Sequence, residues 1–191
     1  MNAKETEKLW TAVWYLKRNK SAQAIKQIYS MLEHKPAATG GLGDALASIA
    51  EKEIGVMEIP RNSNSGKRVK EYQASTWYDG TGWPWCAAFV CFCVRALGEL
   101  PFKRPETPGA WDFENWAERE KLDIVEDPQR GDLQRGDIVC FNISHIGIVA
   151  KVSGGRIETI EGNTDQSGSR EGGGVYRGRR KVSDFRSRIR I

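Results

Sequence analysis

Cys86 is the residue of this chain whose position best suits nucleophilic chemistry. It follows the turn Trp83-Pro84-Trp85 and opens an apolar stretch, Cys86–Val94, that is typical of a buried helix. Backbone N–H groups in the first turn of a helix lack intrahelical partners, and the helix dipole adds partial positive charge there. Both effects favour the thiolate, which is the nucleophilic form of cysteine. We therefore expect a reactive cysteine at this position, provided that a histidine can reach it.

His145 is the candidate partner of this thiol. A cysteine nucleophile needs an imidazole within hydrogen-bonding reach, and the chain has two histidines. His34 lies between Glu33 and Lys35, a setting that predicts a solvated residue at a helix end. His145 begins an apolar, strand-like segment, so it is the only histidine expected in the core.

Two polar residues on the following strand could orient this imidazole. That strand ends in Glu161-Gly162-Asn163. Because residues two apart on a strand face the same way, Glu161 and Asn163 can both point toward a neighbouring His145. Either could accept the Nδ1–H of the imidazole and hold the ring, as the third member of a catalytic triad does. The spacing leaves open which of them does so.

Helices are expected first along the chain and strands afterwards. Apolar residues at helical spacing predict helices at 5–17, 21–32, 44–54, 69–73, 86–94 and 111–118, the third capped by Asp44. After Gly136 the pattern changes to short apolar runs that predict strands at 138–141, 145–150 and 156–161. This order favours an α+β fold, with N-terminal helices packed on a C-terminal antiparallel β-sheet.

The N-terminal helices are expected to stand apart from the main domain. Residues 1–40 predict an αα-hairpin followed by a Pro/Gly-rich linker, and residues 41–191 predict the catalytic domain. The hairpin could be a targeting or binding appendage, or an extra helical layer on that domain.

Composition limits the classes of protein that remain. Of the 191 residues, 39 % are apolar and 28 % are charged, which is ordinary for a globular chain with one sizeable core. No apolar run reaches the ~18 residues of a membrane span, and the polar N-terminus predicts no secretory signal peptide. Reduced thiols are expected, with Cys91, Cys93 and Cys140 as small buried hydrophobes, and no zinc site is expected.

A basic segment ends the chain. Between Arg177 and Arg190 there are seven basic residues and one acid, within a formal net charge of +4. Such an edge could attract a polyanion such as an anionic wall polymer or a membrane surface. The arginines alternate with Phe185, Ser187 and Ile189, so the segment could equally be the solvated face of a half-buried strand. No base-stacking or groove-reading motif accompanies it, and nucleic acid is not an expected partner.

Four short motifs resemble those of one known family. They are Trp85-Cys86-Ala87-Ala88-Phe89, Arg135-Gly136-Asp137-Ile138-Val139-Cys140-Phe141, Ser144-His145-Ile146-Gly147-Ile148-Val149 and Ile160-Glu161-Gly162-Asn163-Thr164. In this order they resemble the CHAP domains, the cysteine, histidine-dependent amidohydrolases/peptidases of the papain-like NlpC/P60 superfamily. The resemblance spans roughly residues 44–191, and the segment 53–60 resembles phage-associated, endolysin-type members in particular.

The resemblance implies hydrolysis of bacterial peptidoglycan at a peptide bond or an N-acetylmuramoyl–L-alanine amide bond. It makes Cys86 the nucleophile, His145 the base, Glu161 the partner of the histidine and Asn163 a fourth polar residue. It also implies a phage lysin that is made in the cytoplasm of the host cell and reaches the wall through a holin or another delivery system.

The stretch before the nucleophile carries two further expectations. Some relatives bind calcium there through an acidic loop, but Tyr78–Trp85 holds a single acid, so no metal or other cofactor is expected. Its four aromatic residues could line a substrate groove or pack in the core. These are Trp77, Tyr78, Trp83 and Trp85.

Two functions of other classes remain open at this point. One is a catalytically silent wall-binding or phage structural protein, although such a module has no need of Cys86, His145 and Glu161 together. The other is a cysteine amidase that acts on a small-molecule conjugate. The sequence does not settle the oligomeric state.

Overall fold

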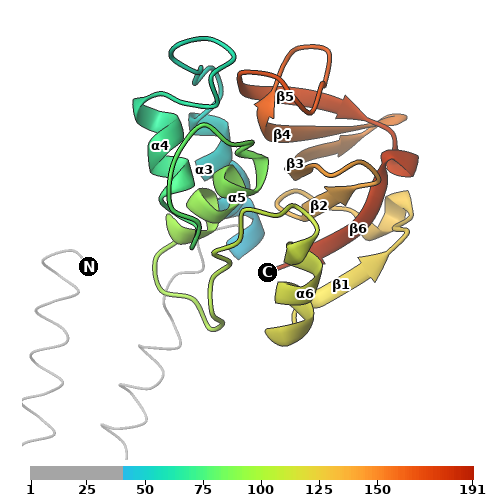
Figure 1. The fold of residues 1–191 in the computed structure, drawn as a ribbon. Helices are drawn as coiled ribbons and strands as arrows, with labels where there is room; N and C mark the ends of the chain where they lie inside the picture. Colours follow the sequence, from blue (N-terminus) through green and yellow to red (C-terminus); the bar gives the residue numbers. More distant parts are fainter. Residues whose placement is uncertain (1–40) are drawn as a thin grey trace, which may run out of the picture. The chain divides into compact units, whose positions relative to one another are not determined.

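The computed structural model describes residues 41–191, so the predicted hairpin at 1–40 lies outside the described residues. Within 41–191 four α-helices come first and a six-stranded antiparallel sheet follows, which confirms the expected α+β class. The helices are α3 (Leu42–Lys52), α4 (Lys67–Gln73), α5 (Cys86–Arg95) and α6 (Asp112–Arg119). In Figure 1, helices α3, α4 and α5 lie together on one side of the sheet.

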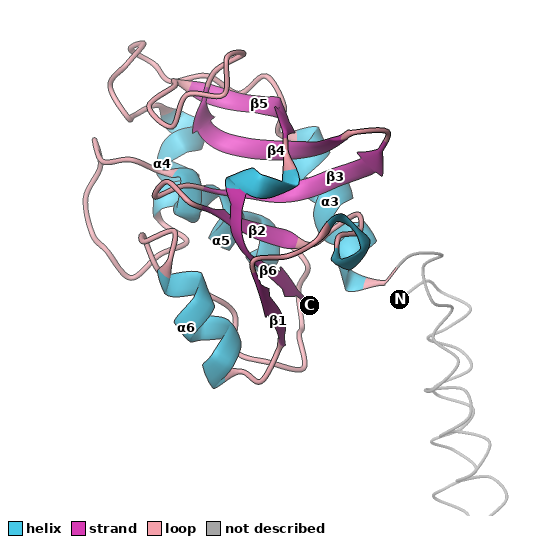
Figure 2. Ribbon diagram, turned by 90° about the vertical axis from the view of Figure 1, so that its right-hand side faces the viewer, coloured by secondary structure: helices cyan, strands magenta, loops and turns pink. Residues whose placement is uncertain are grey.

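The sheet has the strand order β1-β6-β2-β3-β4-β5, and each neighbouring pair is antiparallel. Figure 2 shows this order across the sheet, with β5 at one edge and β1 at the other. The strands are β1 (Asp123–Glu126), β2 (Ile138–Phe141), β3 (Ile146–Ser153), β4 (Arg156–Thr164), β5 (Gly174–Arg180) and β6 (Phe185–Arg190). Two short 3-10 helices, η1 (Arg130–Asp132) and η2 (Val182–Asp184), connect strands.

Helix α5 is the centre of the larger core. Eight of its ten residues are buried, as its apolar composition predicts. It contacts α3 and α4 as well as strands β3 and β4. The contact with β4 depends on Gly162, because a Cβ there would come within 2.6 Å of Phe89 Cβ and 2.9 Å of the Trp85 ring. The absence of a side chain at this position therefore brings the end of β4 close to the start of α5.

All four described helices differ from the expected ones by one or two residues at an end. Helix α3 begins at Leu42 with Gly41 as its N-cap, so the prediction that Asp44 caps the helix is wrong. Asp44 lies in the first turn, where its negative carboxylate is attracted by the positive end of the helix dipole and stabilises the helix. Helix α6 begins at Asp112, one residue later than expected.

The strands show larger differences from the sequence pattern. Strand β2 has the expected bounds, but β4 continues to Thr164, past the expected end at Glu161. The basic C-terminal segment is two strands, because η2 separates β5 from β6. These two strands are not neighbours: β5 pairs with β4, whereas β6 lies between β1 and β2.

A smaller apolar cluster contains Phe141, Val149 and Phe185, separate from the main core around α5.

No helix among residues 41–191 is long and apolar enough to cross a membrane.

Candidate active site

Cys86 is the first residue of α5. The preceding residue, Trp85, has φ −120° and ψ 18°, and no side chain of residues 41–191 caps the helix. The N–H groups of the first turn therefore remain free to bind an oxyanion. Cys86 is 7 % exposed, whereas the other three cysteines are 0 % exposed. Cys86 is the cysteine that borders the surface, at the helix end where a thiolate is favoured.

The other three cysteines are small core residues, as expected. Burial raises the pKa of Cys91 and of Cys140 to about 12, and it raises the pKa of Cys93 well above its usual range. All four cysteines are free thiols. Since a protonated, enclosed thiol is a poor nucleophile, Cys86 alone of the four has the setting of a reactive cysteine.

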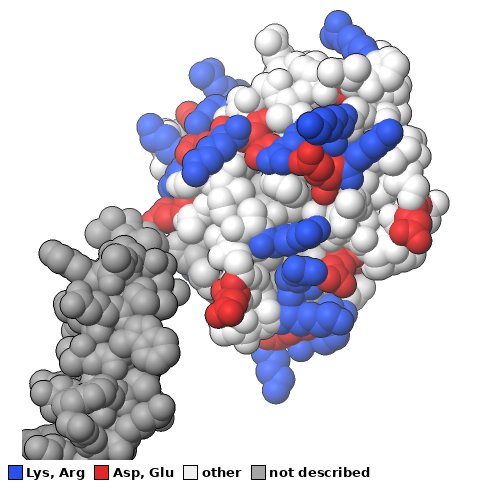
Figure 3. All heavy atoms as spheres, turned by 90° about the vertical axis from the view of Figure 1, so that its left-hand side faces the viewer, with Lys and Arg blue, Asp and Glu red and all other residues white. Residues whose placement is uncertain are grey.

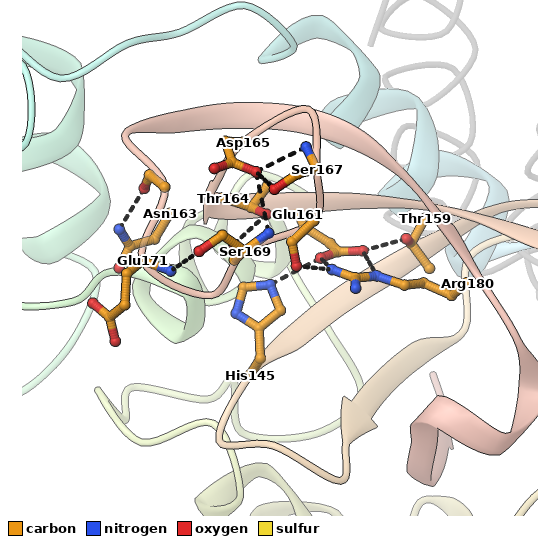
Figure 4. Close-up of polar contacts among 12 residues, drawn as sticks. His145, Thr159, Glu161, Asn163, Thr164, Asp165, Ser167, Ser169, Glu171 and Arg180 are labelled. Atoms are coloured by element: carbon orange, nitrogen blue, oxygen red, sulfur yellow. Dashed lines mark hydrogen bonds and ion pairs between the residues drawn. The ribbon is translucent and has the colours of Figure 1, made fainter.

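His145 and Glu161 form a fully buried pair (Figure 4). His145 Nε2 lies 2.9 Å from Glu161 Oε2, and both side chains are 0 % exposed. The expectation that Nδ1 contacts the orienting residue is therefore wrong. Nε2 makes this contact, and Nδ1 is buried without a well-formed hydrogen bond among the described residues. Cys86 is among the groups that raise the pKa of His145. Because Nε2 is occupied by Glu161, Nδ1 is the nitrogen left for Cys86.

The surroundings favour a charged imidazole. Burial opposes charge on His145, but hydrogen bonds with Cys86 and Glu161 outweigh it and raise the pKa of His145 to about 9. Burial likewise opposes charge on Glu161, but hydrogen bonds from Arg180 and His145 lower the pKa of this carboxyl to about 2. Near neutral pH the pair is thus an imidazolium and a carboxylate.

Two further residues hold Glu161, and sequence reasoning missed both roles. Thr159 Oγ1 donates to Glu161 Oε1, and Arg180 Nε donates to the same oxygen at 2.8 Å. The sequence pattern indicates only that Arg180 belongs to the basic C-terminal segment. No spacing rule within one strand could have found it, because Arg180 lies on β5 and reaches Glu161 across the β4–β5 pair.

Asn163 does not orient His145. Its Oδ1 accepts the backbone N–H of Trp85 at 2.9 Å, and its Nδ2 donates to the carbonyl of Gly172 at 2.8 Å. Asn163 has φ +55°, and the β4–β5 register shifts between Glu161 and Thr164. The two-residue alternation of a regular strand therefore fails here, and Asn163 faces the segment before Cys86.

The four aromatic residues divide into two groups. Trp85 is 0 % exposed, donates its indole N–H to Glu58 Oε1 at 2.9 Å and stacks on Tyr72, so its assignment to a substrate groove is wrong. Trp77 and Tyr78 are 67 % and 47 % exposed, and their rings meet edge to face. Trp83 is half-buried and contacts Tyr78 in the same way. Three of the four thus form a partly exposed aromatic row before the nucleophile.

An open cavity of about 550 Å³ adjoins this row. Trp77 lines it together with charged and polar residues from the segment before α6 and from α6 itself, including Lys103, Arg104 and Asn115. The residues that line it do not include Cys86, His145 or Glu161. The cavity is thus a separate depression that shares Trp77 with the aromatic row.

Most of the basic side chains between residues 177 and 190 face acidic partners. Five of the seven form ion pairs: Arg177–Glu51, Arg180–Glu161, Arg186–Glu114, Arg188–Asp123 and Arg190–Asp137. Figure 3 shows a similar mixture on one face of the molecule, with several Lys and Arg side chains beside Asp or Glu. Binding of an anionic polymer through this segment stays a prediction.

Among residues 41–191 no group of three or more His, Cys, Asp or Glu side chains is arranged to hold a metal ion. The stretch before the nucleophile contributes Asp79 as its one acid, on an exposed loop.

Comparison with known proteins adds one finding. Residues 77–163 match the family model of the CHAP domain, and this segment includes Cys86, His145, Glu161 and Asn163. No curated protein matches the sequence. The segment from residue 77 to residue 163, with its cysteine at a helix start and its buried histidine–glutamate pair, therefore belongs to the CHAP domain family.

Proposed function

We propose that this protein is a cysteine hydrolase that cleaves an amide bond of bacterial peptidoglycan, as an endopeptidase or as an N-acetylmuramoyl-L-alanine amidase. The observation that carries the proposal is the arrangement of Cys86, His145 and Glu161 within the segment that matches the CHAP family. A cysteine at the start of a helix and a histidine immediately before strand β3 also support a papain-like, NlpC/P60 fold. The motif resemblance further supports a phage lysin as the biological setting.

The first chemical step follows from the charges at the site. In the reactive form that we propose, the Cys86 proton is on His145 Nδ1, and Glu161 accepts the Nε2–H of the resulting imidazolium. The Cys86 sulfur attacks the carbonyl carbon of the scissile amide and forms a tetrahedral intermediate. Free N–H groups in the first turn of α5, that of Cys86 among them, stabilise the oxyanion.

The second half of the reaction releases both products. The imidazolium of His145 gives its Nδ1 proton to the leaving nitrogen, the C–N bond breaks, and an acyl-thioester on Cys86 remains. Neutral His145 then takes a proton from water, and the resulting hydroxide attacks the thioester. The carboxylic acid leaves, and the thiolate–imidazolium pair is restored.

The exposed aromatic row suits a substrate of sugars and short peptides. Trp77 and Tyr78 are exposed aromatic rings in the segment before α5, and such surfaces bind the apolar faces of sugars and peptide side chains. We place the substrate along this row, with the scissile amide at Cys86.

The test is digestion of purified peptidoglycan by the full chain and by Cys86→Ala and His145→Ala, with mass spectrometry of the released fragments. Wild type should release soluble fragments, and the new amine identifies the bond. Both variants should lose at least about a thousandfold in rate, as when a nucleophile or its base is removed elsewhere. Cys91→Ala is the matched control in the same helix, and it should keep the activity.

Two results would contradict the proposal. Fragment release by Cys86→Ala at the wild-type rate would exclude the cysteine mechanism. Binding to peptidoglycan without release of fragments by the wild type would indicate a silent binding module, and turnover of a small amide with inert walls would indicate a small-molecule amidase.

A further inference from the structure

Arg180 lies against the proposed catalytic residues although it is outside the segment that matches the CHAP family. Its guanidinium makes a two-point contact with Glu161: Nε donates to Oε1 at 2.8 Å and Nη2 donates to Oε2. Nη2 also donates to the carbonyl of Gly168 at 3.1 Å. The side chain is 13 % exposed. This is the planar, forked geometry in which arginine binds a carboxylate most strongly, and it is largely removed from water.

Phe141 contacts both Arg180 and His145. The Arg180 Cζ lies 4.8 Å from the centre of the Phe141 ring, and the ring of His145 lies 5.3 Å from it. A guanidinium over an aromatic face is attracted by the ring's quadrupole. One aromatic side chain therefore restricts the positions of the base and of the arginine at the same time.

The hydrogen bonds of Glu161 show what Arg180 contributes. Oε2 accepts from His145 Nε2 and from Arg180, and Oε1 accepts from Thr159 and from Arg180 (Figure 4). Of these donors, Arg180 alone carries a charge that does not titrate near neutral pH. A buried carboxylate that lacks such a partner takes up a proton.

Two other titratable groups act on these side chains. Cys86 raises the pKa of His145, and Asp184 in η2 raises the pKa of Arg180. In the proposed reactive form, the positive charge of Arg180 cancels the negative charge of Glu161. The thiolate of Cys86 and the imidazolium of His145 likewise cancel, so the four groups together carry no net charge. Without Arg180, the same buried group would carry one uncompensated negative charge.

We infer that Arg180 is a positioning residue for the proposed hydrolysis. It keeps Glu161 ionised and oriented so that Glu161 Oε2 accepts the His145 Nε2–H. This inference rests on the proposed roles of Cys86 and His145. Arg180 acts through Glu161 and does not touch the reacting atoms.

The inference predicts a changed pH dependence when the charge is removed. In Arg180→Met, burial is no longer opposed by the guanidinium, so Glu161 takes up a proton at a higher pH than in wild type. A protonated Glu161 stabilises the imidazolium less, so His145 loses its proton more readily and returns it to Cys86. The thiolate–imidazolium pair should then disappear at a higher pH as the solution is acidified.

The experiment follows alkylation of Cys86 by iodoacetamide across the acid and neutral pH range, in the full chain, by peptide mass spectrometry. Arg180→Met should raise the acid midpoint of the alkylation rate by about one pH unit or more, which is about a tenfold or greater loss of rate at pH values well below the wild-type midpoint. Arg179→Met is the matched control, since Arg179 is an exposed neighbour on the same strand, and it should keep the wild-type profile.

Two further variants separate charge from geometry and from fold. Arg180→Lys keeps the charge but loses the fork, so the midpoint should stay near that of wild type while kcat for hydrolysis falls. Arg180→Met in a Glu161→Gln background should shift the midpoint no further, because there is no carboxylate left to hold ionised. If thermal unfolding shows that Arg180→Met does not fold, Arg180→Gln takes its place.

Three results would overturn the inference: an unshifted midpoint in a folded Arg180→Met or Arg180→Gln variant, an unchanged kcat in Arg180→Lys, or an equal shift in the Glu161→Gln background. Alkylation needs no substrate. If the wild type does not hydrolyse peptidoglycan, the proposed function fails, while the alkylation profiles still decide the role of Arg180.

Discussion

Asn163 Oδ1 accepts the backbone N–H of Trp85 at 2.9 Å, so the end of β4 is tied directly to the residue before Cys86. The amide of the same side chain donates to Gly172 at 2.8 Å. One asparagine therefore connects the start of α5, the end of β4 and the loop that follows β4. Neither His145 nor Glu161 takes part in these two hydrogen bonds.

The first prediction concerns this asparagine. Asn163→Ala leaves the buried Trp85 N–H without its acceptor, which should lower the free energy of unfolding by about 1–3 kcal/mol. The backbone at Asn163 has φ +55°, so alanine adds about 1–2 kcal/mol of strain that Asn163→Gly avoids. Urea denaturation of the two variants tests both effects. Equal losses for alanine and glycine would contradict the backbone contribution.

A second prediction concerns the contact between β4 and α5. Gly162→Ala places a Cβ within 2.6 Å of Phe89 Cβ, so β4 must move away from the helix. We expect a loss of about 1–3 kcal/mol in unfolding free energy. The rate of hydrolysis should fall as well, because Glu161 and His145 move relative to Cys86. Gly155→Ala is the control, since nothing lies within 4 Å of a Cβ there. A Gly162→Ala variant as active and stable as this control would refute the close approach.

The aromatic residues before the nucleophile should respond in opposite ways to substitution. Trp85→Phe removes the indole donor of Glu58, a buried carboxylate whose Oε2 already lacks a partner among the described residues. It should lower the unfolding free energy by about 1–3 kcal/mol and leave KM unchanged. Trp77→Ala should change the unfolding free energy by less than about 0.5 kcal/mol and raise KM for peptidoglycan fragments. Thermal unfolding and steady-state kinetics distinguish the two, and an unchanged KM in Trp77→Ala would remove Trp77 from the proposed groove.

The fourth prediction is the acid dependence of stability. The pKa of Glu161 is lowered from its ordinary value of 4.5 to about 2, so ionised Glu161 stabilises the folded state. This stabilisation is complete above pH 4.5 and is lost as the pH falls from 4.5 toward 2. Urea denaturation across this range should show unfolding free energy decreasing with acidity in wild type. Glu161→Gln should be less stable at neutral pH, because Arg180 loses its carboxylate, yet its stability should decrease less steeply below pH 4.5. An identical slope in the two proteins would contradict the assignment.

Local sequence features predicted which side chains form the candidate site, namely Cys86, His145 and Glu161. The apolar run after Trp85 predicts a buried helix with Cys86 at its first turn, because burial and helix polarity are properties of consecutive residues. The segments around His145 and Glu161 likewise predict neighbouring strands, and the order of helices before strands predicts the α+β class. The structure agrees with each of these expectations about the elements.

Tertiary structure decided how those groups meet. The alternation rule puts Glu161 and Asn163 on one face, but the register shift in β4 and the positive φ of Asn163 separate them. Which nitrogen of His145 contacts Glu161 depends on how the two side chains are oriented in the folded structure, and no single segment of sequence contains that information. Arg180 reaches Glu161 only because β5 pairs with β4, a long-range pairing that charge patterning along the chain does not reveal. The sequence by itself thus determined that a cysteine and a histidine are available, and the packing of the sheet decided what orients the histidine.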